Sequence, residues 1–432
     1  MLTACGRQFV DWTAAYRLFS KARINIDKIF DVACKNFLEE LAPDQMIIAH
    51  VDDTILKKTG KKVPGAAWRR DPLGPPFQTN LIWGQRFLQI SMALTGPEGN
   101  CQSRAIPVDF HHCPTVKKPD KSAGEEEIEA FKEDRKIAKL SKQGSLRIKA
   151  LRDRLDEQGV ANRQLLVSVD GSYTNETVLK SLPDRVTLIG RIRKDTKLYK
   201  IPDQQPGTGR KRVYGDRLPT PEDIRKYDLA PWQSVSAWAA GKSHNFSIKV
   251  VHDTRWRSAG QNHTLQLVII KPLGYRLTKN SRILYRQPAY LICSDNELDI
   301  TKLLQAYLWR WEIEVNFRDE KSLLGCGDAQ VRSPQSVKSV PAFTVAMHAL
   351  IHLAAQKICK NRDQTILPKA KWDPVKPNQR LSSSEIINMF RAQIWGKSRQ
   401  ESFSGFVKNQ HQIKSQRNIA DLLTSAIFYT RI

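Results

Sequence analysis

The sequence lacks paired cysteines, long apolar runs and an excess of acid. Its seven cysteines are scattered over 432 residues without a C-x-x-C pair, which argues against a disulfide framework and favours reduced thiols. No apolar run approaches the roughly 18 to 20 residues of a membrane span, and the N-terminus has no signal-peptide pattern. These absences predict a soluble protein of the cytoplasm.

Acidic residues are too few to balance the basic ones. The chain has 44 Asp and Glu against 69 Lys and Arg, which gives a net charge of +25 and a pI near 9.8. Such a charge indicates a polyanionic partner, most simply nucleic acid, although it is also compatible with a merely soluble basic protein. The apolar content of 41% is ordinary and, at this length, allows a large core and more than one domain.

The segment 301–324 contains neither Gly nor Pro and predicts one helix, with Asp299 or Thr301 as its cap and Gly325 at its end. At about 100° per residue, four of its side chains fall within roughly 60° of one another. Acids elsewhere on this helix point away (Glu312, Asp319, Glu320). The shared face consists of Tyr307, Arg310, Glu314 and Lys321.

A carboxylate flanked by cations on one helix face suits a metal ion beside a phosphate chain. The alternative is a solvated charged face with Glu–Arg pairs. Two further acids follow apolar runs that predict strands: Asp52 comes after Met46–Ala49, and Asp170 comes after Leu165–Val169. We expect both aspartates at strand ends, and the neighbouring Asp53 on the other face of its strand.

The spacing Y-x2-R-x3-E-x6-K of the shared face resembles the signature of bacterial insertion-sequence transposases of family four, within the DDE transposases. The resemblance covers about residues 45 to 355. It implies an RNase H-like core in which Asp52, Asp170 and Glu314 are the catalytic residues and the metal ligands. Two Mg²⁺ ions, which Mn²⁺ can replace, would activate water and stabilise the leaving oxygen. Asp52 matches the family motifs best, and Asp53 stays an alternative.

The resemblance also implies double-stranded DNA as partner: transposon terminal inverted repeats and target DNA, held by a homodimer during cut-and-paste transposition near the bacterial nucleoid. Arg310 and Lys321 would bind phosphates of the transposon end, and Tyr307 would hydrogen-bond one nearby. In the family a Trp of the insertion stacks on a flipped base. The possible platforms are Trp232, Trp238 and Trp256, of which Trp256 is preferred; packing within the insertion is the alternative.

A second function class stays open, a catalytically inactive DNA-binding protein derived from such a transposase. The predicted fold is α/β, an RNase H-like mixed sheet flanked by helices and interrupted by a mostly β insertion, with helical terminal regions. The predicted regions are an N-terminal helical region (1–45), the first part of the core (46–192), the insertion (193–300), the second part of the core (301–358) and a basic C-terminal region (359–432).

Local patterns refine this outline. Apolar spacing predicts helices over 26–41 and 340–358, and a charged crossover helix over about 124–155. The run His111-His112-Cys113 has no partner pair with zinc-finger spacing, so a metal cluster there is not expected. His348 and His352 lie four apart on an apolar helix and are expected to be core or capping residues.

Overall fold

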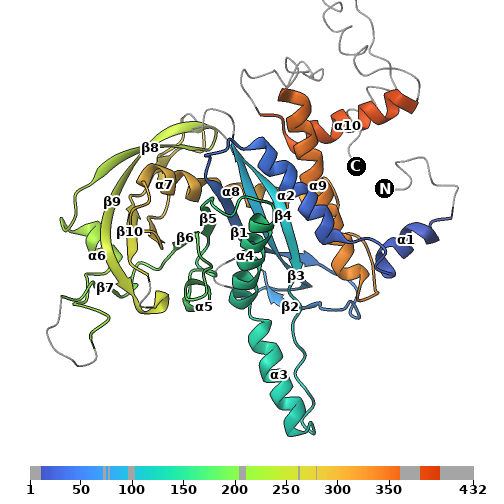
Figure 1. Ribbon diagram of the computed structural model, residues 1–432, viewed down its shortest axis with the longest axis horizontal. Coiled ribbons are helices and arrows are strands. Elements are labelled where there is room, and N and C mark those ends of the chain that lie inside the picture. The colour runs from blue at the N-terminus through green and yellow to red at the C-terminus, as the bar shows by residue number, and fades with distance from the viewer. Residues whose placement is uncertain are drawn as a thin grey trace, which may run out of the picture.

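In the computed structural model, the described residues are 11–71, 74–75, 78–95, 103–203, 211–260, 263–278, 280–360 and 380–398. Their centre is an eleven-stranded sheet with the order β2-β3-β1-β5-β6-β13-β10-β9-β7, in which β4 also pairs with β3 and β8 also pairs with β9. Helices lie on both faces of this sheet (Figure 1). The mixed sheet with flanking helices confirms the predicted α/β, RNase H-like fold.

The RNase H-like part comprises five strands. Strands β1 (Ile47–Lys57), β3 (Leu81–Thr95) and β4 (Ser103–His112) are antiparallel neighbours. Strands β5 (Leu165–Val169) and β6 (Val186–Arg191) then run parallel to β1. The carboxyl ends of β1, β5 and β6 therefore meet at one edge of the sheet, which we call the carboxyl edge.

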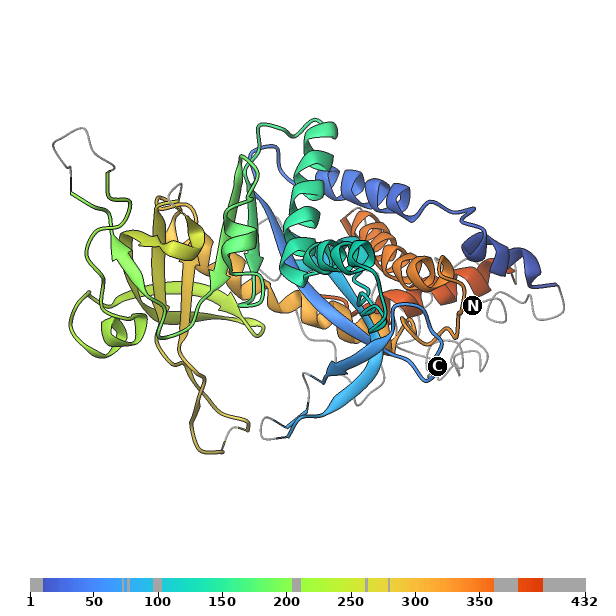
Figure 2. The same ribbon diagram turned by 90° about the horizontal axis from the view of Figure 1, so that it is seen from below.

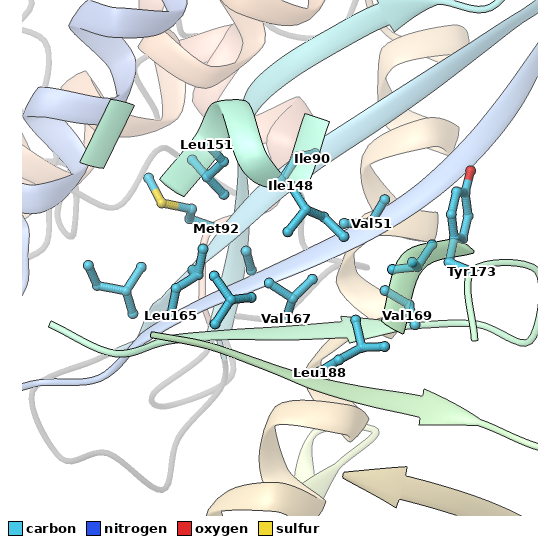
Figure 3. Packing of buried hydrophobic residues seen from close by; sticks show 14 of the residues in the cluster. Val51, Ile90, Met92, Ile148, Leu151, Leu165, Val167, Val169, Tyr173 and Leu188 are labelled. Carbon is cyan, nitrogen blue, oxygen red and sulfur yellow. The ribbon is translucent and has the colours of Figure 1, made fainter. Parts of the chain in front are cut away.

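The central strand β5 is buried on both faces, which explains its unbroken apolar composition. On one face, helix α4 (Leu140–Glu157) supplies Ile148 and Leu151 to the cluster around Val167 and Val169 (Figure 3). On the other face, Leu166 packs with residues of helix α7 (Ile300–Trp309). The periodicity of two in the strand thus positions helices on opposite sides of the same sheet.

The predicted crossover helix is two helices, α3 (Glu125–Ile137) and α4. Lys139 leaves the helical region with ψ of 132° and separates them. α3 buries no residue, whereas α4 buries six. α3 extends away from the sheet (Figure 1), so its few apolar side chains, such as Ile128 and Ile137, stay exposed, whereas those of α4 are buried.

The segment predicted as an insertion extends the core sheet. Strand β13 (Ala289–Cys293) pairs antiparallel with β6, and β10 (Leu265–Ile270) and β9 (Lys242–Trp256) follow it. Elements that the sequence reading missed are helix α6 (Pro221–Lys226), capped by Thr220, and strand β8 (Gln233–Ala239). The smaller elements are β7 (Leu198–Lys200), the 3₁₀ turn Arg257–Ala259, β11 (Gly274–Tyr275) and β12 (Leu284–Tyr285).

Near the N-terminus, helices α1 (Thr13–Ser20) and α2 (Ile26–Glu40) precede the sheet, and Asn25 caps α2. α2 packs against β4 and against α9 (Ser336–Lys360). Helix α10 (Ser383–Ser398) follows, whereas most of the predicted basic C-terminal region (359–432) lies outside the described residues.

The helix predicted over 340–358 is confirmed as part of α9, but the prediction that no apolar run approaches the length of a membrane span was wrong for this helix. Its segment Ser336–Ile358 has a mean hydropathy of 1.3 and is long and apolar enough to cross a membrane, by length and composition. Of this segment, 56% is buried inside the protein, and α9 packs against β4 and α2. These contacts are those of a core helix, and burial among protein side chains accounts for its apolar composition.

Candidate active site

The sequence had suggested that Asp52 lies at the end of a strand. In the structure it lies inside β1. β1 continues through Asp52 to Lys57 because its antiparallel partner β3 continues beside it, from the pair Asp52–Gln89 onward. The parallel ladder with β5, in contrast, stops at the pair Val51–Val169. Asp52 and Asp170 are the next residues on the two adjacent strands. They therefore emerge side by side at the carboxyl edge.

Asp52 is 8% exposed, and both of its carboxylate oxygens have partners. One oxygen accepts a hydrogen bond from the backbone N–H of Asp53 at 2.8 Å. The other lies 2.7 Å from Nη1 of Arg310, with which it forms a salt bridge. The guanidinium that was expected to bind a phosphate thus neutralises a carboxylate of the protein.

Asp170 begins a tight turn after β5. Its carboxylate accepts hydrogen bonds from the backbone N–H of Ser172 at 2.9 Å and from the Ser172 hydroxyl at 3.2 Å. Its carbonyl accepts a hydrogen bond from the hydroxyl of Thr174 at 2.7 Å. These local bonds are typical of Asp at turn positions, and they hold the side chain at the carboxyl edge.

The helix that carries the third acid is broken at Arg310. α7 ends at Trp309 and α8 (Trp311–Ser322) begins after Arg310, so the prediction of one continuous helix was wrong. The backbone N–H of Arg310 bonds the carbonyl of Tyr307 at 3.2 Å, a tight 3₁₀-type turn. The Arg310 side chain reaches Asp52 from this break. The predicted cap, Asp299, does bond the N–H of Lys302 at 3.0 Å.

The three predicted acids interact electrostatically. The pKa of Asp52 is raised to about 7: burial is the largest cause, Arg310 opposes the rise, and the charges of Asp170 and Glu314 add to it. Glu314 itself forms no hydrogen bond or salt bridge with any residue that the structure describes. The structure thus brings together acids that are 262 residues apart in sequence, from Asp52 to Glu314.

The other acids of α8 have partners elsewhere, as expected. Glu312 pairs with Arg380 at 2.8 Å. Asp319 accepts a hydrogen bond from Ser383, and Glu320 is hydrogen-bonded to Gln89 and His348. Of the acids on α8, only Glu314 therefore interacts with Asp52 at the carboxyl edge.

Two further predicted residues, Lys321 and Tyr307, differ in how they relate to the three acids. Lys321 is close enough to Glu314 for the carboxylate to raise the pKa of Lys321, although desolvation lowers that pKa overall. Tyr307 is half-buried and packs against the apolar cluster that contains Leu303 and Leu304. No described contact joins the Tyr307 side chain to the acids.

Of the three tryptophans considered, Trp256 shares a cavity with the residue that follows one of the acids. It lines a cavity of about 680 Å³ together with Gly171, Arg191 and Lys194, and Gly171 directly follows Asp170. Trp232, in contrast, lies under the ammonium group of Lys249 at 4.8 Å, and the backbone of Trp238 is bonded to Gln305.

The sequence did not identify the partners of Asp53. Its carboxylate accepts a hydrogen bond from the hydroxyl of Tyr173 at 3.1 Å and lies 3.2 Å from Nε of Arg86. Tyr173 is fully buried and belongs to the turn that begins at Asp170 (Figure 3). The adjacent Asp-Asp pair was the available signal, because alternate side chains of a strand face opposite sides.

Three of the histidines singled out in the sequence, His112, His348 and His352, are buried. His112 packs against the ring of Phe87, and its two nitrogens are buried without a described partner. His348 and His352 are buried core residues whose Nε2 atoms lie 2.8 Å apart.

The donor set at the carboxyl edge fits a divalent ion in its chemistry. Three carboxylates provide the hard oxygen ligands that Mg²⁺ prefers. Burial first, and the charges of Asp170 and Glu314 second, raise the pKa of Asp52, and a bound cation would offset both effects. Within the described residues, however, no three acidic, His or Cys side chains are grouped closely enough to hold an ion as they stand. Arg310 would have to release Asp52 before an ion bound.

A comparison with known families agrees with this geometry. Residues 9–260, more than half of the chain, match the family described as DDE superfamily endonuclease. The chain belongs to the DDE superfamily of endonucleases. The matched segment contains Asp52 and Asp170, whereas Glu314 lies beyond it. Members of this superfamily act on DNA and generally use divalent metal ions. No curated protein matches the chain.

Proposed function

We propose that this DDE superfamily endonuclease is a transposase of the insertion-sequence family four type. It cuts at the terminal inverted repeats of its element and joins the freed 3′ ends to target DNA, as a homodimer in the bacterial cytoplasm near the nucleoid. The observation that carries the proposal is the electrostatic coupling of Asp52 with Asp170 and Glu314 at the carboxyl edge.

The assigned metal ligands are Asp52, Asp170 and Glu314. Two Mg²⁺ ions, or Mn²⁺, would supply water activation and charge stabilisation at the phosphorus. Arg310 would exchange its partner, from the Asp52 carboxylate to a DNA phosphate, when the metal takes up the carboxylate charge. Binding of DNA and binding of metal would then each strengthen the other. The metal pairs with the Asp52 carboxylate that Arg310 leaves, and the phosphate pairs with the freed Arg310.

The remaining roles follow from position. Lys321 would contact a phosphate as a point charge, and Tyr307 would hydrogen-bond another after its half-buried side chain turns outward. Trp256 would stack on a flipped base within its cavity, where Arg191 and Lys194 can hold the adjacent phosphates. The cavity beside Gly171 supports the choice of Trp256 among the three tryptophans.

The test is cleavage of a plasmid that carries the flanking terminal repeats. We expect nicking in Mg²⁺ that is lost in EDTA, in Asp170→Ala and in Glu314→Ala. Glu312→Gln is the matched control, because Glu312 is an acid of the same helix that pairs with Arg380 instead of facing the cluster. DNA binding without cutting in any divalent metal would instead support the alternative, an inactive DNA-binding protein derived from a transposase.

A further inference from the structure

Two basic ribbons leave the sheet at the carboxyl edge. The first ribbon comprises residues 57–86, where β2 (Ala67–Arg70) pairs with the start of β3. The second ribbon comprises residues 271–286, where β11 pairs with β12. The first has seven Lys or Arg against one Asp, a net charge of +6; the second has five Lys or Arg and no acid, a net charge of +5. Figure 2 shows both ribbons extending from the same side of the molecule.

Sheet topology explains why the ribbons share an edge. The first ribbon continues β1 and β3 beyond Asp52. The second ribbon connects the end of β10 to the start of β13. β13 runs antiparallel to β6, so its start lies at the end of β6, close to Arg191. In the order β3-β1-β5-β6-β13-β10, the strand of Asp52 leads into the first ribbon, and β5, which precedes Asp170, lies between the two ribbons.

Both ribbons also have exposed aromatic side chains, which a merely solvated charged loop does not require. Trp68 of the first ribbon is 65% exposed and rests edge-on against Trp83, with ring centroids 5.6 Å apart. Trp83 is itself fixed by a hydrogen bond to the carbonyl of Gly60. In the second ribbon, Tyr285 is 69% exposed and Arg286 lies over the ring of Tyr275.

We propose that the two ribbons form a clamp for duplex DNA, one on each side of the cutting site. The net positive charge of both ribbons complements the phosphate backbone, and fixed aromatic rings provide contact with bases at little entropic cost. This inference rests on the proposed function for the position of the cut, but not for the binding itself. Within the strand order, five spacings of about 4.8 Å separate β3 from β10, so the two contacts lie roughly 24 Å apart at the sheet.

The experiment measures binding of the full-length protein to a linear duplex in EDTA, as a function of salt. Arg70 and Arg282 are exposed cations of the first and second ribbon. Arg70→Ala and Arg282→Ala should each reduce the slope of log affinity against log salt by about 0.9, the value for one lost phosphate contact. Trp68→Ala and Tyr285→Ala should weaken binding roughly tenfold at unchanged slope.

Two controls accompany these variants. Lys302→Ala removes an exposed cation at the start of α7, which follows β13 at the opposite edge of the sheet, and should leave the slope unchanged. Trp68→Phe keeps an aromatic ring and should retain most of the affinity. If the ribbon variants instead alter only self-association, measured by light scattering, the ribbons are a protein interface and the clamp is wrong.

Hydroxyl-radical footprints in Ca²⁺ then locate the contacts. Protection lost in Arg70→Ala should lie on one side of the mapped nick, and protection lost in Arg282→Ala on the other, each within about one helical turn. Losses on the same side would overturn the clamp. If the wild type binds but never nicks, the proposed function fails, while the slopes still decide whether the ribbons bind DNA.

Discussion

The guanidinium of Arg310 lies 2.7 Å from the carboxylate of Asp52 and joins the break between α7 and α8 to the edge that contains Asp170. The positive charge of Arg310 partly offsets the negative charges of Asp52, Asp170 and Glu314. In the DNA-free protein this salt bridge keeps a desolvated carboxylate paired. Metal binding must therefore displace a protein cation, and this requirement leads to measurable consequences.

The first consequence concerns the pH dependence of metal affinity. Because the pKa of Asp52 is raised to about 7, the carboxyl group holds a proton below that pH, and a divalent ion must displace it. Mn²⁺ affinity, measured by calorimetry, should rise with pH through about 7 and then level off. Arg310→Gln removes the group that lowers this pKa, so the midpoint should move upward. An affinity that is flat between about pH 6 and 9 would contradict the assignment.

A second consequence concerns stability without metal. An acid with a raised pKa in the folded state binds protons more tightly there, so its contribution to stability is present below its unfolded pKa of 3.8 and is lost as pH rises through about 7. Asp52→Asn removes this loss. We expect the variant to melt roughly 1–3 °C above the wild type at pH 8 in EDTA, with a smaller difference at pH 5. Asp120→Asn, at an exposed acid, should show no such gain.

The hydrogen bond between Asp53 and Tyr173 predicts a positioning effect. It ties β1 to the turn that holds Asp170, on the face opposite to Asp52. Tyr173→Phe should lower the free energy of unfolding by about 1 kcal/mol and reduce the rate of cleavage more than the affinity for DNA. Tyr227→Phe, which alters an exposed hydroxyl, is the control. Unchanged stability and unchanged cleavage would show that the bond positions nothing.

Close packing at Gly144 predicts that Gly144→Ala lowers the free energy of unfolding. A Cβ at this position would lie 2.6 Å from Cδ1 of Tyr173. Gly→Ala in a helix ordinarily stabilises by up to about 1 kcal/mol, but here the contact should outweigh that gain and cost about 1–3 kcal/mol. Denaturant unfolding measures the change. In a Tyr173→Leu background the same substitution should cost less, and equal costs in both backgrounds would refute the steric account.

The three acids could be proposed from the sequence because their signals are local. Four residue types at fixed spacing marked Glu314, and apolar runs marked the strands before Asp52 and Asp170. Local spacing did not, however, show the break at Arg310, since neither Gly nor Pro occurs there. It also did not show that β1 continues past Asp52, because the length of a strand depends on how far its partner β3 extends beside it.

By itself, the sequence predicted the α/β fold and a nucleic-acid partner, since composition and periodicity are properties of the chain, and its resemblance to a transposase family singled out the three acids. Only the tertiary structure decided that Arg310 pairs with Asp52, that Asp53 is bonded to Tyr173, and that two basic ribbons share the carboxyl edge. Those relationships join segments up to 258 residues apart. Strand order and helix packing create such contacts, and no local pattern of residues encodes them.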